Sequence, residues 1–541
     1  MRTMVPHIEI SDRPRGAVLA DTSGVSYVMV LLTIAVLGSM ALSFVTVTGL
    51  EIDIASNYVN NTRAHYLARA GLNVAIWGVL NVPNFTTDYG DRPARYTFDG
   101  MPLYFMVKRA ALNKSVYVRS YGNVAGAVST FDHLIISSLD LEQGPPCMVA
   151  YGEKTRIAPR YRMWQATNWS SEAVANAVDD EINWVVLRGC TVRDEKMLGT
   201  LDNSGHIYVQ VWDGSGWGPA GQAATGADSS CCGFDIAYES VSGDGLAVYK
   251  SGLSETDVCY RVWDGTAWGS EGLLELPTAG YPRWVVMASD PNSDEIVVAV
   301  HDSQRDIAVS VWNGSVFANT ITIETSTPDS GKSCVAVGYE SVSGRAMVVW
   351  GAFKADNARY TIWDGVSWSA QADAPNIGAA PEWLRLAPDP TSNRILLGTL
   401  DSSKHVNVMF WNGVSWEVPL EVETGVGNTD GRCFDVAYES SGDEAMVAWW
   451  DNGVTTLDYR VWTSGVWSEE LAGPELGDQI WIVQLVPNPV TDVMFLSAKI
   501  HPAALQETLK VARWNGSVWG APVTVELESS GGSTESFMVS F

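Results

Sequence analysis

Val211-Trp212-Asp213-Gly214-Ser215-Gly216-Trp217 decides the fold, because close copies of this stretch recur down to the C-terminus. The first tryptophans of successive copies are 48, 51, 49, 51, 48, 51 and 52 residues apart, counted from a degenerate copy at Trp164. A period near fifty residues, with a strand–turn–strand signature in each unit, is typical of a β-propeller. Eight copies predict eight blades. Seven of them carry tryptophan at both aromatic positions: Trp164 and Trp169, Trp212 and Trp217, Trp263 and Trp268, Trp363 and Trp368, Trp411 and Trp416, Trp462 and Trp467, and Trp514 and Trp519.

Each copy of the motif predicts a β-hairpin. The residues before the first tryptophan alternate, as in Tyr208-Val209-Gln210-Val211-Trp212, which indicates a half-buried strand. The Asp-Gly or Asn-Gly pair supplies the left-handed backbone of a tight turn. The second aromatic residue returns on the next strand, close enough to pack against the first. We therefore interpret these aromatic residues as blade core, with stacking on a glycan as the alternative role.

Two kinds of unit alternate along the repeats. One opens with a strand that carries a tryptophan, at Trp184, Trp284, Trp383 and Trp481. The other opens with Phe234–Ser240 or with its copies at 335–341 and 434–440. The first unit has no opening strand, since Cys147–Tyr151 matches a second strand, whereas Ser536–Phe541 matches the missing one. Pairing these two segments hides two sheet edges, so the sequence predicts a closed ring.

Oxygen and imidazole side chains recur before the turns of the Trp-opened units and form a candidate ligand face. Asp202, Asp302 and Asp401 lie ten residues before the turn tryptophan, and His206 and His405 lie six before it. These groups are suited to a divalent cation or a sugar, and no other cofactor is indicated. The alternative is that each aspartate makes the same Asx turn within its own copy.

Acidic charge is concentrated in the repeats. The formal net charge is −28, yet residues 1–140 hold 11 Lys+Arg and 10 Asp+Glu, which leaves 23 basic and 52 acidic residues for 141–541. Such a surface repels phosphate backbones and excludes nucleic acid as a partner. Glu239, Glu340 and Glu439 directly follow a predicted strand, and we interpret them as solvated turn residues.

Neither motifs nor cysteines identify a reaction. The chain shows no GxSxG elbow, HExxH, P-loop or dinucleotide-binding fingerprint in a suitable setting. Its seven cysteines form neither a disulfide framework nor a CxxC zinc spacing. Cys232, Cys334 and Cys433 occupy equivalent repeat positions, where a small buried thiol is the usual explanation. The sequence therefore favours a binding protein over an enzyme.

The N-terminal part predicts a long helix that begins in a membrane. Residues 25–50 carry no charge and are long enough to cross a bilayer. Apolar positions continue at helical spacing to Leu80, before Asn81 and Pro83 end the pattern. Such a helix is about 80 Å long. The arginines before the span and the carboxylates after it favour a C-terminus outside the cytoplasm.

Residues 17–140 resemble type IV pilin-like proteins, namely minor pilins and pseudopilins. The resemblance lies in the leader ending at Gly24, the uncharged helix and Tyr66-Leu67-Ala68-Arg69-Ala70-Gly71-Leu72, which matches a "YLAxAGL" signature. It continues through short strand-like stretches between 95 and 137, like the small sheet that covers such a helix.

The resemblance implies cleavage by a prepilin peptidase after Gly24, which leaves Val25 as the mature N-terminus. Met29 stands where the family often has glutamate, a departure tolerated in some tip-located members. Cleavage after Gly16 is the rival frame, although it puts Asp21 inside the apolar helix. An uncleaved signal anchor unrelated to pili is the third interpretation.

These expectations divide the chain into a leader at 1–24, a pilin-like α+β domain at 25–140 (helix 25–80, sheet 92–140), a linker at 141–146 and a propeller at 147–541. The protein is expected to be a single-pass membrane protein that displays an extracellular head for adhesion or ligand binding. Its expected partners are the membrane, other pilin-like subunits, and a surface glycan or protein. The alternatives are a tethered propeller enzyme acting on glycans and a structural pseudopilin of a secretion system.

Overall fold

The computed structural model describes Ala64 and residues 96–98, 101–109, 115–124, 127–136, 146–165, 167–250, 256–329, 331–427, 430–440, 444–501 and 506–541. Among these residues no helix has the length and apolar character needed to span a membrane. The predicted leader, the cleavage site at Gly24 and Val25, and the predicted span at 25–50 lie outside the described residues. The pilin-like helix therefore stays a prediction.

The described N-terminal residues form one four-stranded sheet in the order β1-β2-β3-β4. Its strands are β1 (Tyr96–Phe98), β2 (Met101–Arg109), β3 (Ser115–Val124) and β4 (Ala127–Ile136). β1 and β2 pair antiparallel, with Tyr96 opposite Leu103. Most of this sheet belongs to one compact unit, and the repeats belong to a second.

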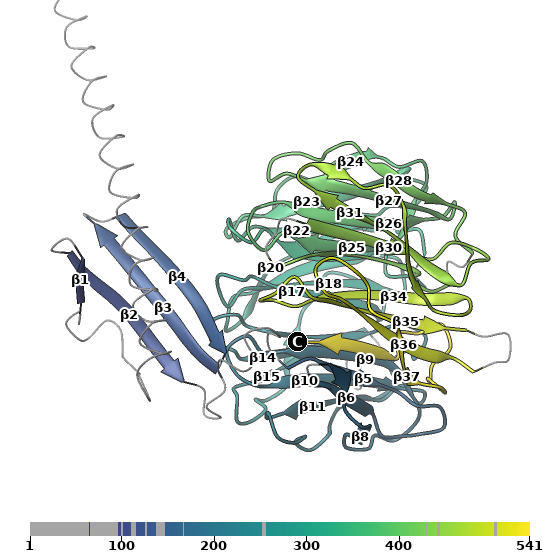
Figure 1. The fold of residues 1–541 in the computed structure, drawn as a ribbon, viewed down its shortest axis with the longest axis horizontal. Helices are drawn as coiled ribbons and strands as arrows, with labels where there is room; N and C mark the ends of the chain where they lie inside the picture. Colours follow the sequence, from purple (N-terminus) through teal and green to yellow (C-terminus); the bar gives the residue numbers. More distant parts are fainter. Residues whose placement is uncertain are drawn as a thin grey trace, which may run out of the picture. The chain divides into compact units, whose positions relative to one another are not determined.

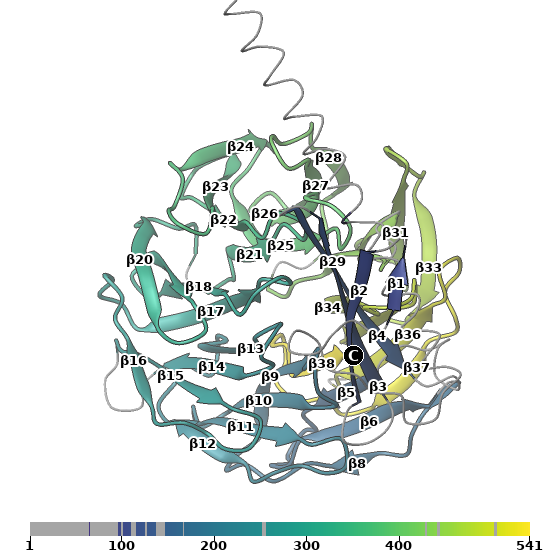
Figure 2. The ribbon, with the colours of Figure 1, turned by 90° about the vertical axis from the view of Figure 1, so that its left-hand side faces the viewer.

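The described residues between 147 and 541 form eight further sheets, which are the blades of a propeller (Figures 1 and 2). Blade 1 consists, from the inside outwards, of β38 (Phe537–Ser540), β5 (Met148–Tyr151), β6 (Arg160–Gln165), β7 (Asn168–Trp169) and β8 (Ala173–Val174), and blade 3 consists of β13 (Phe234–Tyr238), β14 (Gly245–Lys250), β15 (Val258–Trp263) and β16 (Gly272–Leu274). Blade 5 consists of β21 (Val335–Tyr339), β22 (Ala346–Gly351), β23 (Asn357–Trp363) and β24 (Ala372–Asn376), and blade 7 consists of β29 (Phe434–Tyr438), β30 (Glu444–Trp449), β31 (Thr456–Thr463), β32 (Val466–Trp467) and β33 (Leu471–Glu475). Blade 2 consists of β9 (Ile182–Gly189), β10 (Lys196–Asp202), β11 (Ile207–Trp212) and β12 (Gly221–Ala224), and blade 4 consists of β17 (Pro282–Ser289), β18 (Ile296–Asp302), β19 (Ile307–Trp312) and β20 (Phe317–Glu324). Blade 6 consists of β25 (Pro381–Pro388), β26 (Ile395–Asp401), β27 (His405–Trp411) and β28 (Leu420–Thr424), and blade 8 consists of β34 (Ile480–Pro487), β35 (Met494–Ile500), β36 (Thr508–Trp514) and β37 (Val523–Glu526). The eight-bladed all-β propeller predicted from the repeats is confirmed.

The C-terminal strand closes the ring. β38 pairs antiparallel with β5, with Phe537 opposite Tyr151 and Ser540 opposite Met148. The innermost strands contact one another in sequence order, and β38 also contacts both β9 and β34. Figure 2 looks onto the blades, with β38 between β34 and β9. The closure predicted from the missing first strand is thus confirmed, because the last strand of the chain completes the first blade.

The turn aromatics pack between blades, as the core interpretation expects. A tyrosine three residues before the turn tryptophan of each odd blade lies against the aromatic pair of the next even blade. Tyr360 contacts Trp411 and Trp416, with ring centroids 5.6 and 5.7 Å away. Tyr161, Tyr260 and Tyr459 make the equivalent contacts with Trp212 and Trp217, Trp312 and Phe317, and Trp514 and Trp519. Each odd-to-even interface is therefore filled by aromatic rings.

The interpretation of Glu239, Glu340 and Glu439 as solvated turn residues is wrong. All three are buried. Each carboxylate accepts the indole N–H of the turn tryptophan in the next blade, at 2.7 Å from Trp312, Trp411 and Trp514 respectively. The partner lies more than seventy residues away along the chain, so local sequence could not reveal the bond.

The fourth Trp-opened unit is also shifted by one residue. Trp184, Trp284 and Trp383 lie opposite Leu201, His301 and Leu400, whereas the equivalent Lys499 lies opposite Ile482. Trp284 packs edge to face against Trp184 and Trp383, with centroids 5.3 and 5.6 Å apart. Trp481 instead stacks on His501, at 4.1 Å between centroids. Blade 8 therefore contributes no tryptophan to this inner cluster.

Truncating the closing strand at its most buried side chain tests the ring. Phe537 is fully buried. Phe537→Ala is expected to lower the free energy of unfolding by about 3–5 kcal/mol, through lost burial and the cavity left behind. Val518→Ala, at an exposed turn tip, is the control and is expected to change it by less than about 0.5 kcal/mol. Urea unfolding followed by tryptophan fluorescence compares the two, and equal unfolding curves would show that β38 does not hold the ring closed.

Candidate functional site

The predicted ligand face consists of separate buried hairpin turns. Asp202, Asp302 and Asp401 end the second strands of blades 2, 4 and 6, and all three are fully buried. Their Oδ1 atoms accept backbone N–H groups at 2.8 to 3.0 Å: from His206; from Gln304 and Asp306; and from Ser403 and His405. This is the geometry that the Asx-turn alternative expects. Because the three carboxylates end strands of different blades, the fold distributes them around the ring.

The two predicted histidines have acidic neighbours. His206 Nδ1 lies 3.4 Å from both Asp202 Oδ2 and Asp179 Oδ2, and His405 Nδ1 lies 3.0 Å from Glu421 Oε2. Burial raises the pKa of Asp401, against the hydrogen bonds that it accepts. Within the described residues, no group of three or more His, Cys, Asp or Glu side chains is placed to hold a metal. The divalent-cation site stays a prediction from the sequence.

The structure instead brings together a set of side chains that repeats in alternate blades. In blade 3, Tyr249 on β14, Arg261 on β15, Trp268 after the turn and Glu271 before β16 lie around one inter-blade groove. Strand register gives the equivalent sets in the other odd blades. They are Tyr151, Arg162, Trp169 and Glu172 in blade 1, Trp449, Arg460, Trp467 and Glu470 in blade 7, and Trp350, Thr361, Trp368 and Gln371 in blade 5.

A small residue opens the groove between blades 2 and 3. The position three residues before the turn tryptophan is tyrosine in odd blades and valine in even blades, and in blade 2 it is Val209. Val209 leaves space in front of Trp268, and a cavity of about 40 Å³ lies there, lined also by Gln222, Tyr249 and Arg261. The lining residues of one wall come from β11 and β12, and those of the other come from β14 and β15. Figure 2 shows these strands in neighbouring blades.

Polar groups in this groove are held in place but not fully satisfied. Tyr249 Oη donates to Glu271 Oε2 at 2.8 Å, and Arg261 Nη2 lies 3.7 Å from the same oxygen. Burial, and then Glu271, raise the pKa of Tyr249, which keeps the phenol protonated. Arg261 Nε is buried and finds no hydrogen-bond acceptor within the described part of the chain. A buried donor of this kind calls for an acceptor from water or from a ligand.

The equivalent tryptophans in blades 1 and 7 are covered. Trp169 packs against Phe495 of blade 8 at 5.2 Å. Trp467 lies nearly parallel to Phe410 of blade 6, at 5.6 Å between centroids. In blade 5 the arginine and glutamate are replaced by Thr361 and Gln371. Among the blades that carry the complete set, blade 3 is therefore the one whose set lies at an open groove, at the boundary with blade 2.

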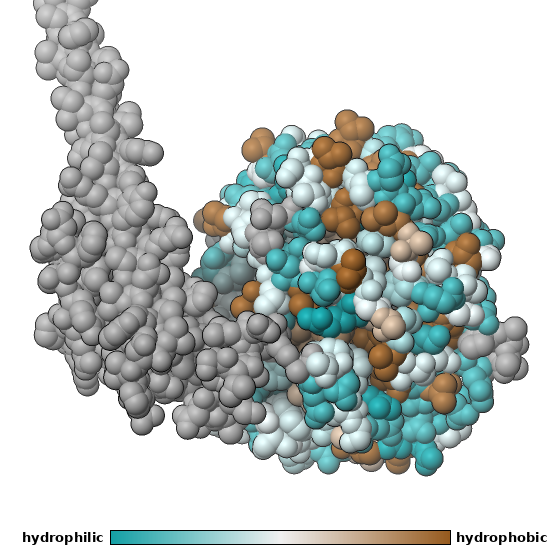
Figure 3. Space-filling model, in the orientation of Figure 1, coloured by the Kyte–Doolittle hydropathy of each residue, from teal (hydrophilic) through white to brown (hydrophobic). Residues whose placement is uncertain are grey.

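An aromatic ring and a guanidinium group around a small hollow can bind a polyol. The guanidinium donates to hydroxyl oxygens, and the ring covers an apolar C–H face. Such convergence of a few polar groups on an apolar cleft is typical of small-molecule sites. On the face of the propeller seen in Figure 3, hydrophobic residues lie scattered among hydrophilic ones. That distribution is not that of a large protein-docking patch.

The sequence did carry a signal for this set, which single-motif reading missed. The arginine lies seven residues before the second turn tryptophan, and the glutamate lies three after it, in blades 1, 3 and 7 alike. Comparing odd units with odd units would have found it. The openness of one groove could not be found that way, because it depends on whether a residue such as Phe410 or Phe495 of the neighbouring blade covers the tryptophan.

No protein-family model matches the chain. No curated protein matches it either. Solved structures with a similar fold include the BP39L lectin from Burkholderia pseudomallei (12% identity, 64% of this chain and 99% of that one, TM-score 0.45) and the β-propeller domain of the Trilobed protease from Pyrococcus furiosus (10%, 64% and 100%, TM-score 0.39). Another is the Aleuria aurantia lectin in complex with α-methyl-L-fucoside (17%, 53% and 93%, TM-score 0.33). At these identities and TM-scores the likeness concerns the propeller fold, and no ligand or residue role is carried over.

The groove between blades 6 and 7 should make stability depend on pH. Burial, followed by repulsion from Glu470, Asp451 and Glu423, raises the pKa of Asp458 from its ordinary value near 4 to about 6. A carboxyl group whose pKa is raised on folding stabilises the fold while protonated, and this contribution is lost as the pH rises from about 4 through about 6. Asp458→Asn is therefore expected to raise Tm at pH 7.5 and leave it nearly unchanged at pH 4. Thermal unfolding at both values measures this, with exposed Glu469→Gln as control; a Tm gain that is equal at both pH values would contradict the shift.

Proposed function

We propose that the propeller is a carbohydrate-binding head and that the groove at Arg261 and Trp268 is its binding site. The observation that carries the proposal is the placement of these two side chains, with Tyr249, around an open hollow between blades 2 and 3. The buried Nε of Arg261 is a donor in need of an acceptor. Sugar hydroxyls supply such acceptors, and the ring of Trp268 offers a surface for the apolar face of a pyranose.

The positions of the carboxyl groups favour binding of a sugar over hydrolysis of a glycosidic bond. Glycosidases of the common type place two carboxyl groups on opposite sides of the scissile bond. The residues that line this groove carry no carboxyl group, and Glu271 beside them is occupied by Tyr249. A tethered enzyme acting on glycans therefore ranks second. Glu271 acts here as a positioning residue for the phenol and the guanidinium group.

The display of this head rests on the N-terminal resemblance. We propose that residues 25–50 anchor the chain in the cell membrane, with the propeller outside the cytoplasm, as a minor pilin or pseudopilin among other pilin-like subunits. A bulky head is hard to repeat at every position of a filament, which favours a tip or a sparse position. The sheet β1-β2-β3-β4 occupies the stretch in which the resemblance expects one. A structural pseudopilin of a secretion system is the alternative role for this part.

Substituting the groove arginine tests the binding proposal. A glycan array is used to choose a ligand for the full-length protein, and calorimetry with methyl glycosides, including α-methyl-L-fucoside, then measures affinity. Arg261→Gln is expected to weaken binding about 10- to 100-fold, since a hydrogen bond to a charged group contributes roughly 1.5–3 kcal/mol. Arg460→Gln is the matched control, because the equivalent groove in blade 7 is covered by Phe410. Equal losses in both variants, or no glycan bound by the native protein, would refute the proposal.

Processing of the N-terminus tests the membrane display separately. Protein extracted from membranes or from sheared filaments of the producing cells is expected to begin at Val25, as Edman degradation or mass spectrometry would show. Gly24→Val is expected to block this cleavage and leave the leader attached. A mature chain that begins at Met1 would instead support the uncleaved signal anchor, without affecting the groove.

A further inference from the structure

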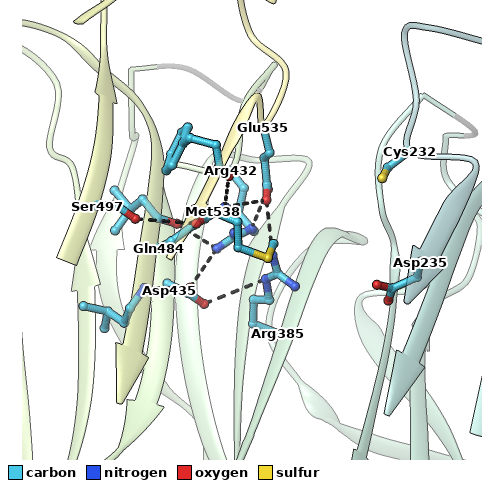
Figure 4. A network of polar contacts seen from close by, with 12 residues as sticks. Cys232, Asp235, Arg385, Arg432, Asp435, Gln484, Ser497, Glu535 and Met538 are labelled. Atoms are coloured by element: carbon cyan, nitrogen blue, oxygen red, sulfur yellow. Dashed lines mark hydrogen bonds and ion pairs between the residues drawn. The ribbon is translucent and has the colours of Figure 1, made fainter. Parts of the chain in front are cut away.

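The innermost strands surround a channel that contains a second cavity, distinct from the groove. Its volume is about 140 Å³, and its lining comes from every blade except blade 8. Trp184, Trp284 and Trp383 form part of its wall, whereas Arg188, Arg385 and Arg432 bring positive charge to it. Figure 4 shows Arg432, Arg385, Asp435 and Glu535 grouped on one wall, with Asp235 and Cys232 across the gap.

The aspartates of the channel are used to join blades. Asp235 Oδ2 accepts the Met287 N–H of blade 4 at 2.9 Å, and Asp435 Oδ2 accepts the Leu485 N–H of blade 8 at 3.0 Å. The Oδ1 atoms accept the N–H of Ile236 and Val436, at 2.8 and 2.9 Å. Both carboxylates therefore already accept from two backbone donors and have little capacity for a ligand.

Glu535 is likewise engaged. Its Oε1 lies 3.1 Å from Arg432 Nε, and its Oε2 accepts from Gln484 Nε2 at 3.0 Å. Burial works to raise the pKa of Glu535, but Arg432 and Arg385 outweigh it and lower the pKa to about 2. The carboxylate is thus ionised throughout the physiological range. It holds the C-terminal segment against blade 7 rather than offering an acid to a ligand.

The guanidinium groups, in contrast, keep free donors. Arg432 is 2% exposed and gives Nη1 to the carbonyls of Phe434 and Val483, yet its Nη2 has no acceptor within the described residues. Arg385 Nη2 lies 3.5 Å from Glu535 Oε2. Arg385 Nε lacks an acceptor in the described part of the chain, because the Asp435 oxygen beside it is 3.9 Å away. The Arg385 side chain is 37% exposed and lines the cavity. Leaving such donors unsatisfied is costly, since they have lost water without gaining a partner.

We propose that this channel binds a small molecule that carries a carboxylate, held by the free N–H groups of Arg385 and Arg432. Guanidinium groups match planar carboxylates with charge-assisted hydrogen bonds, and a low-dielectric channel strengthens them. The cavity has room for a few heavy atoms beyond the carboxylate, because one water occupies about 30 Å³ of liquid volume. The tryptophan rings give the remainder of the ligand an apolar surface. This site does not depend on the glycan groove.

Acetate is the probe that tests the channel. Titration of the full-length protein with [13C]acetate, followed by NMR line width, is expected to show saturable binding that equal concentrations of chloride do not reproduce. Arg385→Gln is expected to weaken acetate binding at least tenfold. Arg261→Gln, in the groove, is the matched control and is expected to leave acetate binding unchanged.

The outcomes separate the two sites. Acetate binding lost in Arg385→Gln and kept in Arg261→Gln supports the channel site, whatever the glycan results are. Absence of saturable binding to the native protein, or reversal by chloride alone, overturns the inference and assigns the free donors to water. Should Arg385→Gln fail to fold, as near-ultraviolet circular dichroism would show, the native titration against chloride decides by itself.

Discussion

Aromatic contact between neighbouring blades is the interaction on which the rest of this structure depends. A single four-stranded blade leaves its two apolar faces to be buried by others, so each blade needs a neighbour on both sides. Tyr360 between Trp411 and Trp416 shows the contact that meets this need. A linear array would leave two faces bare. Pairing of β38 with β5 removes that problem and places the ends of the propeller sequence in one blade.

The alternation of two unit types fills the odd-to-even interfaces with aromatic rings. At the even-to-odd interfaces it leaves a space whose filling differs from one copy to the next. Tyrosine at one face of each odd blade completes the odd-to-even interface, whereas Val209 at the even-to-odd interface leaves a hollow in front of Trp268. In blades 6 and 8 the hollow is closed by Phe410 and Phe495. A repeated arginine and glutamate thus acquire a different surrounding in each copy. The candidate site results from this difference between copies and not from the repeat alone.

Charge inside the propeller has two uses that geometry tells apart. Asp235 and Asp435 spend their oxygens on backbone N–H groups of the next blade and so join sheets. Glu535 joins the last segment of the chain to Arg432 of blade 7. Arg385 and Arg432, which each keep a donor without an acceptor in the described part of the chain, line the channel. Inside the propeller, the carboxylates therefore link strands, whereas the two arginines keep donors available, although the chain as a whole is strongly acidic.

The sequence by itself determined the number of blades, the alternation of two unit types and the closure by Ser536–Phe541, because each follows from spacing and strand pattern that repeat along the chain. It also placed the turn aromatics in the core. Only the tertiary structure decided that Glu239, Glu340 and Glu439 are buried acceptors, that Ile482 takes the register position of the opening tryptophan in blade 8, and which groove is open. The physical reason is distance along the chain. A repeat fixes what each blade contains, but burial and hydrogen bonding between blades depend on side chains about fifty residues or more away, which no local pattern encodes.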